Sequence, residues 1–136
     1  MTRCRPSRAD RGRTQAGAAV VDFVLVSMVL VPLVLGIVQV ALVLHVRNTL
    51  VAAAGEGARY AATVDRAPQS AVIRTRMQID DALAARYADD VSATTAVVAG
   101  VPTIVVRVRA DVPPLGLWGP GIPLEVEAHA VEELLP

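Results

Sequence analysis

The chain has 136 residues and no net formal charge, and hydrophobic residues make up 54% of it while aromatic residues make up 3%. This length allows one small domain plus one long helix and excludes two full domains, and the apolar excess favours a membrane segment. The charge is unevenly placed, because residues 1–16 hold five Arg and one acid whereas residues 18–136 hold eight Arg and twelve acids. Basic charge confined to a tail argues against a nucleic-acid-binding face, so no nucleic acid partner is expected.

The first predicted element is a membrane-spanning helix over residues 23–44. These 22 residues contain no ionisable side chain, and sixteen of them are Phe, Leu, Ile or Val. At about 1.5 Å per residue the helix would be about 33 Å long, enough to cross a hydrocarbon core of about 30 Å. Because most Arg residues near the segment precede it, the positive-inside rule puts the N-terminus in the cytoplasm and the rest of the chain outside.

The segment before this helix has two alternative interpretations. An ordinary secretory signal has an apolar core of about 7–15 residues followed by a small-residue cleavage site, whereas this core is longer and small residues follow only beyond Arg47. The other alternative is cleavage after Gly17, which would leave the apolar segment on the mature protein. Asp22 would then lie in the first helical turn, where a negative charge favours the helix dipole by about 0.3–1 kcal/mol.

The helix is predicted to run from about residue 18 to residue 64. Beyond the membrane an apolar stripe recurs every three or four residues, and it consists of Val46, Leu50, Ala54, Ala58 and Ala61 or Ala62. Glu56 and Arg59 form an i,i+3 ion pair worth a few tenths of a kcal/mol. Gly55 and Gly57 each cost up to about 1 kcal/mol in a helix interior, a cost that close backbone packing would offset.

Residues 69–88 are predicted to form a second, amphipathic helix that begins after Pro68. Its apolar positions are Val72, Ile73, Met77, Ile79, Leu83 and Tyr87. The acidic pairs Asp80–Asp81 and Asp89–Asp90 do not predict a metal site, because adjacent helical side chains point about 100° apart and cannot chelate together.

The remaining elements are strands over residues 91–99, 103–112 and 124–131, which close a small antiparallel sheet. The middle strand alternates cleanly, with Ile104, Val106, Val108, Ala110 and Val112 on the buried side. The Pro- and Gly-rich loop before the last strand carries Trp118, which is expected to pack over the sheet edge rather than to anchor to a partner or a membrane surface.

The predicted fold class is therefore α+β: a long N-terminal transmembrane helix that continues outside the membrane, a second amphipathic helix and a small C-terminal antiparallel sheet. The part after residue 65 is too small for a robust core of its own, so it is expected to pack on the long helix or on a neighbour. No residues point to catalysis, since His45 and His129 are separated by the whole outer domain and no Gly-rich phosphate loop occurs. We expect neither an enzyme nor a cofactor or metal site.

Two stretches of this sequence resemble a known family. Residues 17–22, GAAVVD, ahead of an apolar helix, resemble the class III signal of type IV pilin-like proteins, in which a prepilin peptidase cuts after the Gly and an acid at the fifth mature position serves assembly. Residues 45–62, HVRNTLVAAAGEGARYAA, resemble the segment after the helix in TadE-like pseudopilins of Flp (Tad) pilus systems. The resemblance covers residues 11–64 and, more loosely, residues 100–133.

The resemblance implies roles for particular residues. Gly17 and Ala18 flank the processed bond, and Asp22 is the assembly residue, at a position where the family usually has Glu. Cleavage would create an α-amine on Ala18 that Asp22 of a neighbouring subunit could meet. The family motif comprises Arg47, Asn48, Glu56, Gly57, Arg59 and Tyr60.

The resemblance also implies a function and a set of partners. The chain would be a minor pilin or pseudopilin, a structural component in the assembly of Flp (Tad) type IV-like pili for adhesion or secretion. Its partners would be membrane lipid, the prepilin peptidase, other pilin or pseudopilin subunits and the Tad assembly platform. Residues 1–17 would be the leader, 18–64 the helix and 65–136 the outer domain of a single-pass protein of the cytoplasmic membrane or of the pilus. The alternative is an unprocessed, membrane-anchored envelope protein that binds a partner through its outer domain.

Overall fold

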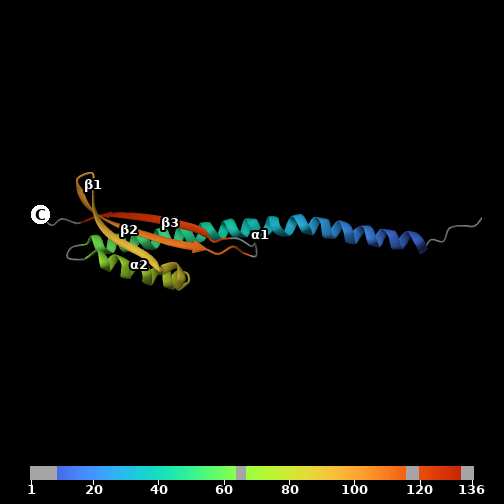
Figure 1. Cartoon of the computed structure of the whole chain (residues 1–136), viewed down its shortest axis with the longest axis horizontal. Coiled ribbons are helices and arrows are strands. Elements are labelled where there is room, and N and C mark those ends of the chain that lie inside the picture. The colour runs from blue at the N-terminus through green and yellow to red at the C-terminus, as the bar shows by residue number, and fades with distance from the viewer. Residues whose placement is uncertain (1–8, 64–66, 116–119, 133–136) are drawn as a thin grey trace, which may run out of the picture. The chain divides into compact units, whose positions relative to one another are not determined.

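The computed structural model describes residues 9–63, 67–115 and 120–132, with side chains from residue 17 onward. In chain order the elements are α1 (Ala9–Ala62), α2 (Pro68–Ala82), the short 3-10 helix η1 (Ala85–Ala88), β1 (Asp90–Val98), β2 (Val101–Val112) and β3 (Ile122–Val131), as labelled in Figure 1. This order of helices and strands confirms the α+β class. The chain divides into two compact units, Met1–Val38 and Gln39–Pro136.

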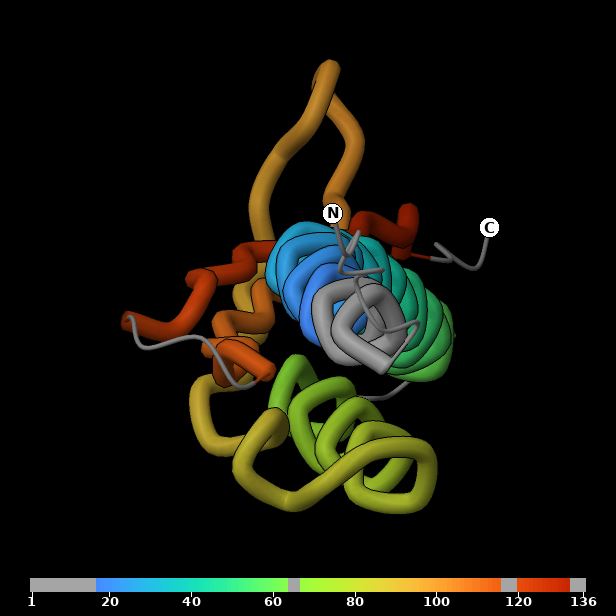
Figure 2. Tube along the Cα trace, turned by 90° about the vertical axis from the view of Figure 1, so that its right-hand side faces the viewer, coloured from blue at the N-terminus to red at the C-terminus, as the bar shows by residue number. Residues whose placement is uncertain are grey.

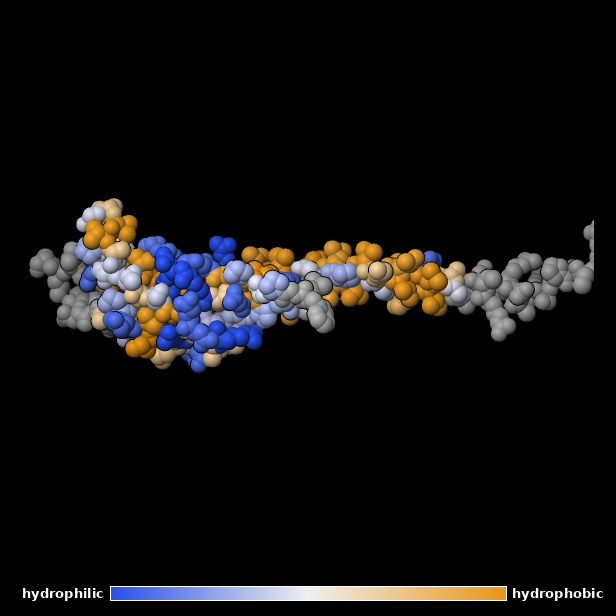
Figure 3. All heavy atoms as spheres, in the orientation of Figure 1, coloured by the Kyte–Doolittle hydropathy of each residue, from blue (hydrophilic) through white to orange (hydrophobic). Residues whose placement is uncertain are grey.

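The first unit is the N-terminal part of α1, which begins at Ala9 and so starts before the predicted residue 18. By length and composition, the stretch from Gly17 to Ala62 could cross a membrane, and none of its most apolar window is buried inside the protein. Phe23 and Met28 are 72% and 75% exposed, and orange side chains run along this stretch in Figure 3. A helix that is apolar all round requires a covering that the described part of the chain does not provide, and lipid would supply it.

The second unit has one hydrophobic core, built on the later part of α1. All of the predicted stripe is buried, with exposures of 4% or less, and it comprises Val46, Leu50, Ala54, Ala58, Ala61 and Ala62. From the sheet, Ile104, Val106 and Val108 of β2 enter the same core, as their alternation predicted. Figure 2 looks along α1 and shows α2 beside it, on a different side from most of the sheet. The outer elements therefore share α1 as their common core element.

The sheet is antiparallel with the order β1-β2-β3. Val98 pairs with Val101 across a two-residue turn in which Ala99 and Gly100 both have positive φ, of 51° and 82°. That geometry matches the right-handed twist of a tight hairpin and suits Gly100. On the exposed face the charges pair across β2 and β3, with Arg107 Nε 3.1 Å from Glu125 and Arg107 Nη2 3.2 Å from Glu127.

The second helix differs from its prediction. It ends at Ala82, and residues 85–88 form the separate η1. Ile73 and Met77, which were assigned to its apolar face, are 62% and 56% exposed. The buried positions are Ala71, Thr75 and Ile79. Small residues face α1 because the two helices lie too close together for large ones.

Gly57 shows how close this approach is. A Cβ atom added at Gly57 would lie 2.8 Å from the carbonyl oxygen of Ala71 and against the side chain of Thr75. Thr75 Oγ1 in turn donates a buried hydrogen bond to the carbonyl oxygen of Ala53 at 3.4 Å. A Cβ at Gly55 would instead meet only the Arg59 guanidinium, at 3.5 Å. Close packing thus explains Gly57, as predicted, but not Gly55. Trp118 lies outside the described residues.

Replacing Gly57 with Ala should separate α1 from α2. The added Cβ would clash with the carbonyl oxygen of Ala71, so the backbone of α2 must move. We therefore expect the free energy of unfolding to fall by about 1–3 kcal/mol. Gly55→Ala is the matched control and should raise it by up to about 1 kcal/mol through helix propensity. Amide hydrogen exchange of β2 in the detergent-solubilised chain measures both changes, and equal protection in the two variants would contradict the packing argument.

Candidate functional site

The residues predicted for processing and assembly lie on the first unit. Gly17, Ala18 and Asp22 are all exposed on α1, and nothing lies within 4 Å of the position that a Cβ of Gly17 would take. Ala18 and Asp22 are four residues apart, so they share one face of the helix, one turn from each other. In the part of the chain that the structure describes, Asp22 forms no ion pair or hydrogen bond. Its carboxylate is therefore available to a group from outside this fold.

The family motif is divided between two surfaces of the second unit. Arg47 and Asn48 are exposed on α1 and make no hydrogen bond or ion pair with the described residues. Glu56, Arg59 and Tyr60 instead gather where α1 meets α2, around the buried Gly57. The structure thus brings four motif residues together at a helix contact and leaves two apart from them.

Arg74 of α2 completes this cluster and was not predicted as part of it. Its Nη2 lies 3.6 Å from Glu56 Oε1, while Arg59 Nη2 lies 3.5 Å from Glu56 Oε2. The Arg74 guanidinium carbon also lies 5.8 Å from the centre of the Tyr60 ring. Sequence patterns could not reveal this contact, because they show only that Arg74 occupies the polar side of its own helix.

The ion pairs of this cluster contribute little to stability, but they orient α2 relative to α1. The Glu56 side chain is 39% exposed and the Arg59 side chain is 69% exposed, so water screens their attraction. Arg74 Nε is buried and has no hydrogen-bond partner among the described residues. The cluster carries one net positive charge and orients α2 on α1 through a shared carboxylate rather than through a strong buried ion pair.

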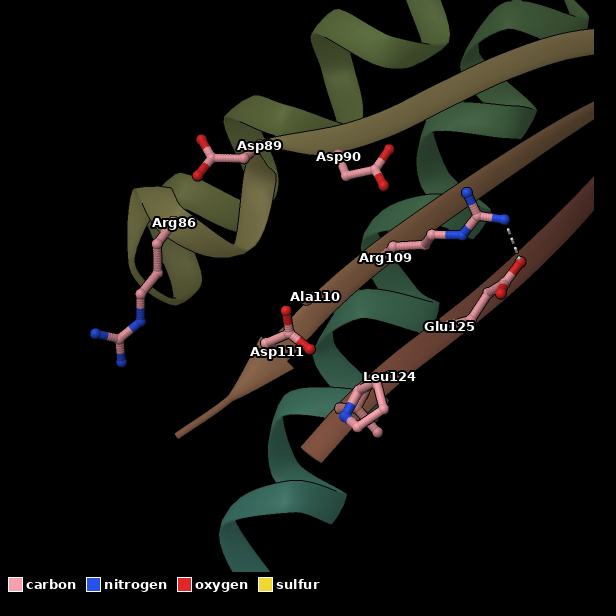
Figure 4. A pocket seen from close by; sticks show the side chains of 9 residues that line it. Arg86, Asp89, Asp90, Arg109, Ala110, Asp111, Leu124 and Glu125 are labelled. Atoms are coloured by element: carbon pink, nitrogen blue, oxygen red, sulfur yellow. Dashed lines mark hydrogen bonds and ion pairs between the residues drawn. The ribbon is translucent and has the colours of Figure 1, made fainter. Parts of the chain in front are cut away.

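A second polar surface surrounds a groove of about 680 Å³ between η1 and the sheet (Figure 4). Its charged lining residues are Arg86, Asp89, Asp90, Arg109, Asp111 and Glu125. Figure 4 shows the adjacent carboxylates of Asp89 and Asp90 pointing in different directions, and Arg109 bonded to Glu125. Within the described residues, no three His, Cys, Asp or Glu side chains lie close enough together to hold a metal ion.

Comparison with known proteins gives a family match for part of this chain. The model of the TadE-like protein family matches residues 17–59, which confirms the resemblance over that segment. The match begins at Gly17, includes Asp22 and ends at Arg59, one residue before Tyr60. No curated protein and no solved structure matches the chain.

Removing the shared carboxylate with Glu56→Ala leaves Arg59 and Arg74 close together without a counter-charge. We expect the free energy of unfolding to fall by about 0.5–1 kcal/mol at low salt, and the loss to shrink at about 1 M salt because screening weakens the repulsion. Asp80→Ala is the control, because Asp80 is exposed on α2 and makes no ion pair with the described residues. This substitution should change the free energy of unfolding by less than about 0.5 kcal/mol. Denaturant unfolding at two salt concentrations measures this, and a salt-independent loss would show that packing rather than charge is involved.

Proposed function

We propose that this chain, whose residues 17–59 match TadE-like proteins, is a minor pilin or pseudopilin that takes part as a structural component in assembling Flp (Tad) type IV-like pili. The family match carries the proposal and supports a Tad pilus-associated component. The apolar part of α1, which is unburied within the protein, supports membrane anchoring. The partners we propose are a prepilin peptidase, other pilin or pseudopilin subunits, the Tad assembly platform and membrane lipid.

In this proposal the peptidase cuts between Gly17 and Ala18. Both residues are exposed, and the space around Gly17 is open. Gly has weak helix propensity, so the turn that holds the bond opens at lower cost than it would with Ala at this position. Cleavage leaves the whole apolar segment on the mature chain and creates an α-amine on Ala18, which is mostly charged at neutral pH.

Asp22 then acts as the register residue between packed subunits. A carboxylate and an amine each cost several kcal/mol when left unpaired at a lipid-exposed position, so helices out of register are penalised. The exposed Asp22 carboxylate, without a partner in the described part of the chain, fits a role in pairing with the Ala18 amine of a neighbour. Such a pair selects the alignment of parallel helices more than it adds net affinity.

The processing step is tested with Gly17→Leu. Because no described atom beyond the adjacent helix backbone lies within 4 Å of the added Cβ, the substitution should leave the fold intact while the peptidase no longer accepts the site. Gly36→Leu is the matched control, since Gly36 lies in equally open surroundings on the same helix. Intact-mass analysis in cells with an active prepilin peptidase should show the first 17 residues retained only in Gly17→Leu. Their retention in the unsubstituted chain would favour the unprocessed, membrane-anchored alternative.

The register role is tested with Asp22→Asn, which keeps the size of the side chain and removes its charge. We expect normal processing but a reduction of about tenfold or more in co-purification with other pilus subunits, the equivalent of about 1.4 kcal/mol or more. Asp22→Glu keeps the charge and should retain assembly. Co-purification by Asp22→Asn at the level of the unsubstituted chain would exclude the charge pairing.

A further inference from the structure

We infer that the two described ends of the β2–β3 connection, residues 113–115 and 120–122, contact the outer leaflet of the membrane through Leu115 and Ile122, and that Gln39 of α1 holds the first of them at that depth. The inference rests on the membrane anchoring in the proposed function, and it adds a second membrane contact made by the outer domain. The contact would be separate from the span itself.

The first observation is the pair of hydrogen bonds made by Gln39. Its Nε2 donates to the carbonyl oxygen of Pro113 at 3.4 Å, and its Oε1 accepts from the backbone N–H of Leu115 at 2.7 Å. Both ends of the amide are therefore satisfied by backbone from a segment more than 70 positions later in the chain. An amide without partners is unfavourable in an apolar environment, so these bonds let Gln39 lie inside the apolar run.

Second, the position of Gln39 along the uncharged run indicates the depth of these bonds in the membrane. The uncharged run continues five residues past Gln39 to Leu44, and His45 is the first titratable residue after it. Five helical residues correspond to about 7.5 Å. The interfacial layer on each side of a bilayer is about 5–7 Å thick. If the polar boundary lies near His45, residues 113–115 lie at the level of the lipid headgroups and the upper acyl chains.

The third observation is the surface around this level, which is apolar and uncovered. Val40 and Leu44 of α1 are 60% and 52% exposed, and they continue the exposed apolar surface of the span. In the same unit, Leu115, whose N–H bonds to Gln39, and Ile122 are 37% and 39% exposed. Lipid is the occupant that this continuity indicates, because one apolar covering then extends from the span to the loop.

The composition of the segment suits that position. Residues 112–124 contain no ionisable side chain. Pro113, Pro114 and Pro123 have no N–H to satisfy, and the N–H of Leu115 is bonded to Gln39. The described ends of the segment thus present few unsatisfied backbone donors to an apolar surface, which is the main constraint on irregular backbone near lipid.

An exposed apolar surface at the other end of β2 provides a comparison. Val97 is 72% exposed next to the β1–β2 turn. The eleven residue steps of β2, from Val101 to Val112, separate that turn from the loop by about 36 Å along the strand. Val97 is therefore as apolar as Leu115 but far from the level of Gln39.

The test uses the full chain with Cys4→Ser, labelled with an environment-sensitive fluorophore at Leu115→Cys or, as the control, Val97→Cys. Each protein is reconstituted into phosphatidylcholine vesicles at a high lipid ratio, with nitroxide-labelled lipids as one quencher and aqueous iodide as the other. We expect nitroxide lipids to quench residue 115 at least about threefold more than residue 97, and iodide to show the reverse order. Ile122→Cys should behave like Leu115→Cys.

Two results would overturn the inference. Equal lipid quenching at both positions would place the loop in water, and protection of residue 115 from both quenchers would mean that protein, such as a second copy, covers it. Adding Gln39→Leu should abolish the excess lipid quenching at residue 115, and an unchanged excess would exclude the holding role of Gln39.

Alkaline extraction of the same vesicles separates this inference from the proposed function. A chain released by alkali is not membrane-spanning, which would overturn the anchoring on which both depend. A chain that resists alkali but shows no excess quenching would overturn only the loop contact. Because the vesicles contain no other pilus component, a failure in pilus assembly would leave the quenching result unaffected.

Discussion

The close approach of α2 to the small-residue face of α1 is the constraint on which the outer part of this protein depends. Gly57 and Ala53 on α1 allow Ala71 and Thr75 to lie against its backbone. The part of the chain after α1 is too short to enclose a robust core alone. With α2 held on one side and the sheet packed on another, the buried stripe of α1 supplies the missing core surface. A larger side chain at Gly57 would therefore act on the whole outer unit and not only on one contact.

One helix thus meets two environments, and its side chains change accordingly. Up to Val38 nearly all of its apolar residues are exposed, and none of them is buried by the described part of the chain. From Val46 onward an apolar stripe on one face is buried, while Arg47 and Asn48 take outer positions. Gln39 lies where the first pattern gives way to the second, and it is the first residue of the unit that contains the sheet. Because α1 is one helix from Ala9 to Ala62, a single element carries both patterns without a linker.

Much of this architecture could be predicted from periodicity, because burial on one face imposes a repeat that a single sequence displays. The α1 stripe and the five inward positions of β2 are confirmed for this reason, although Thr103 and Val105 of β2 are buried as well. The same logic was wrong for Ile73 and Met77, because the distance between helices selects small side chains and hydrophobicity does not report that distance. Arg74 and Gln39 were missed as contact residues because their partners lie on other elements. Gly17 and Asp22 carry no packing signal, so only family resemblance identified them.

Gln39 and Asp22, two polar side chains of α1, differ in where their polar partners come from. Gln39 is neutral, and the backbone of a later segment of the same chain satisfies both of its hydrogen-bonding groups. Asp22 is a carboxylic acid and finds no cationic partner among the described residues. Folding therefore satisfies the hydrogen-bonding groups of Gln39, whereas a counter-charge for Asp22 has to come from an event outside the fold. Under the proposed function that event is cleavage, since it produces a cation one helical turn from Asp22 on every subunit and makes charge pairing between neighbours depend on prior processing.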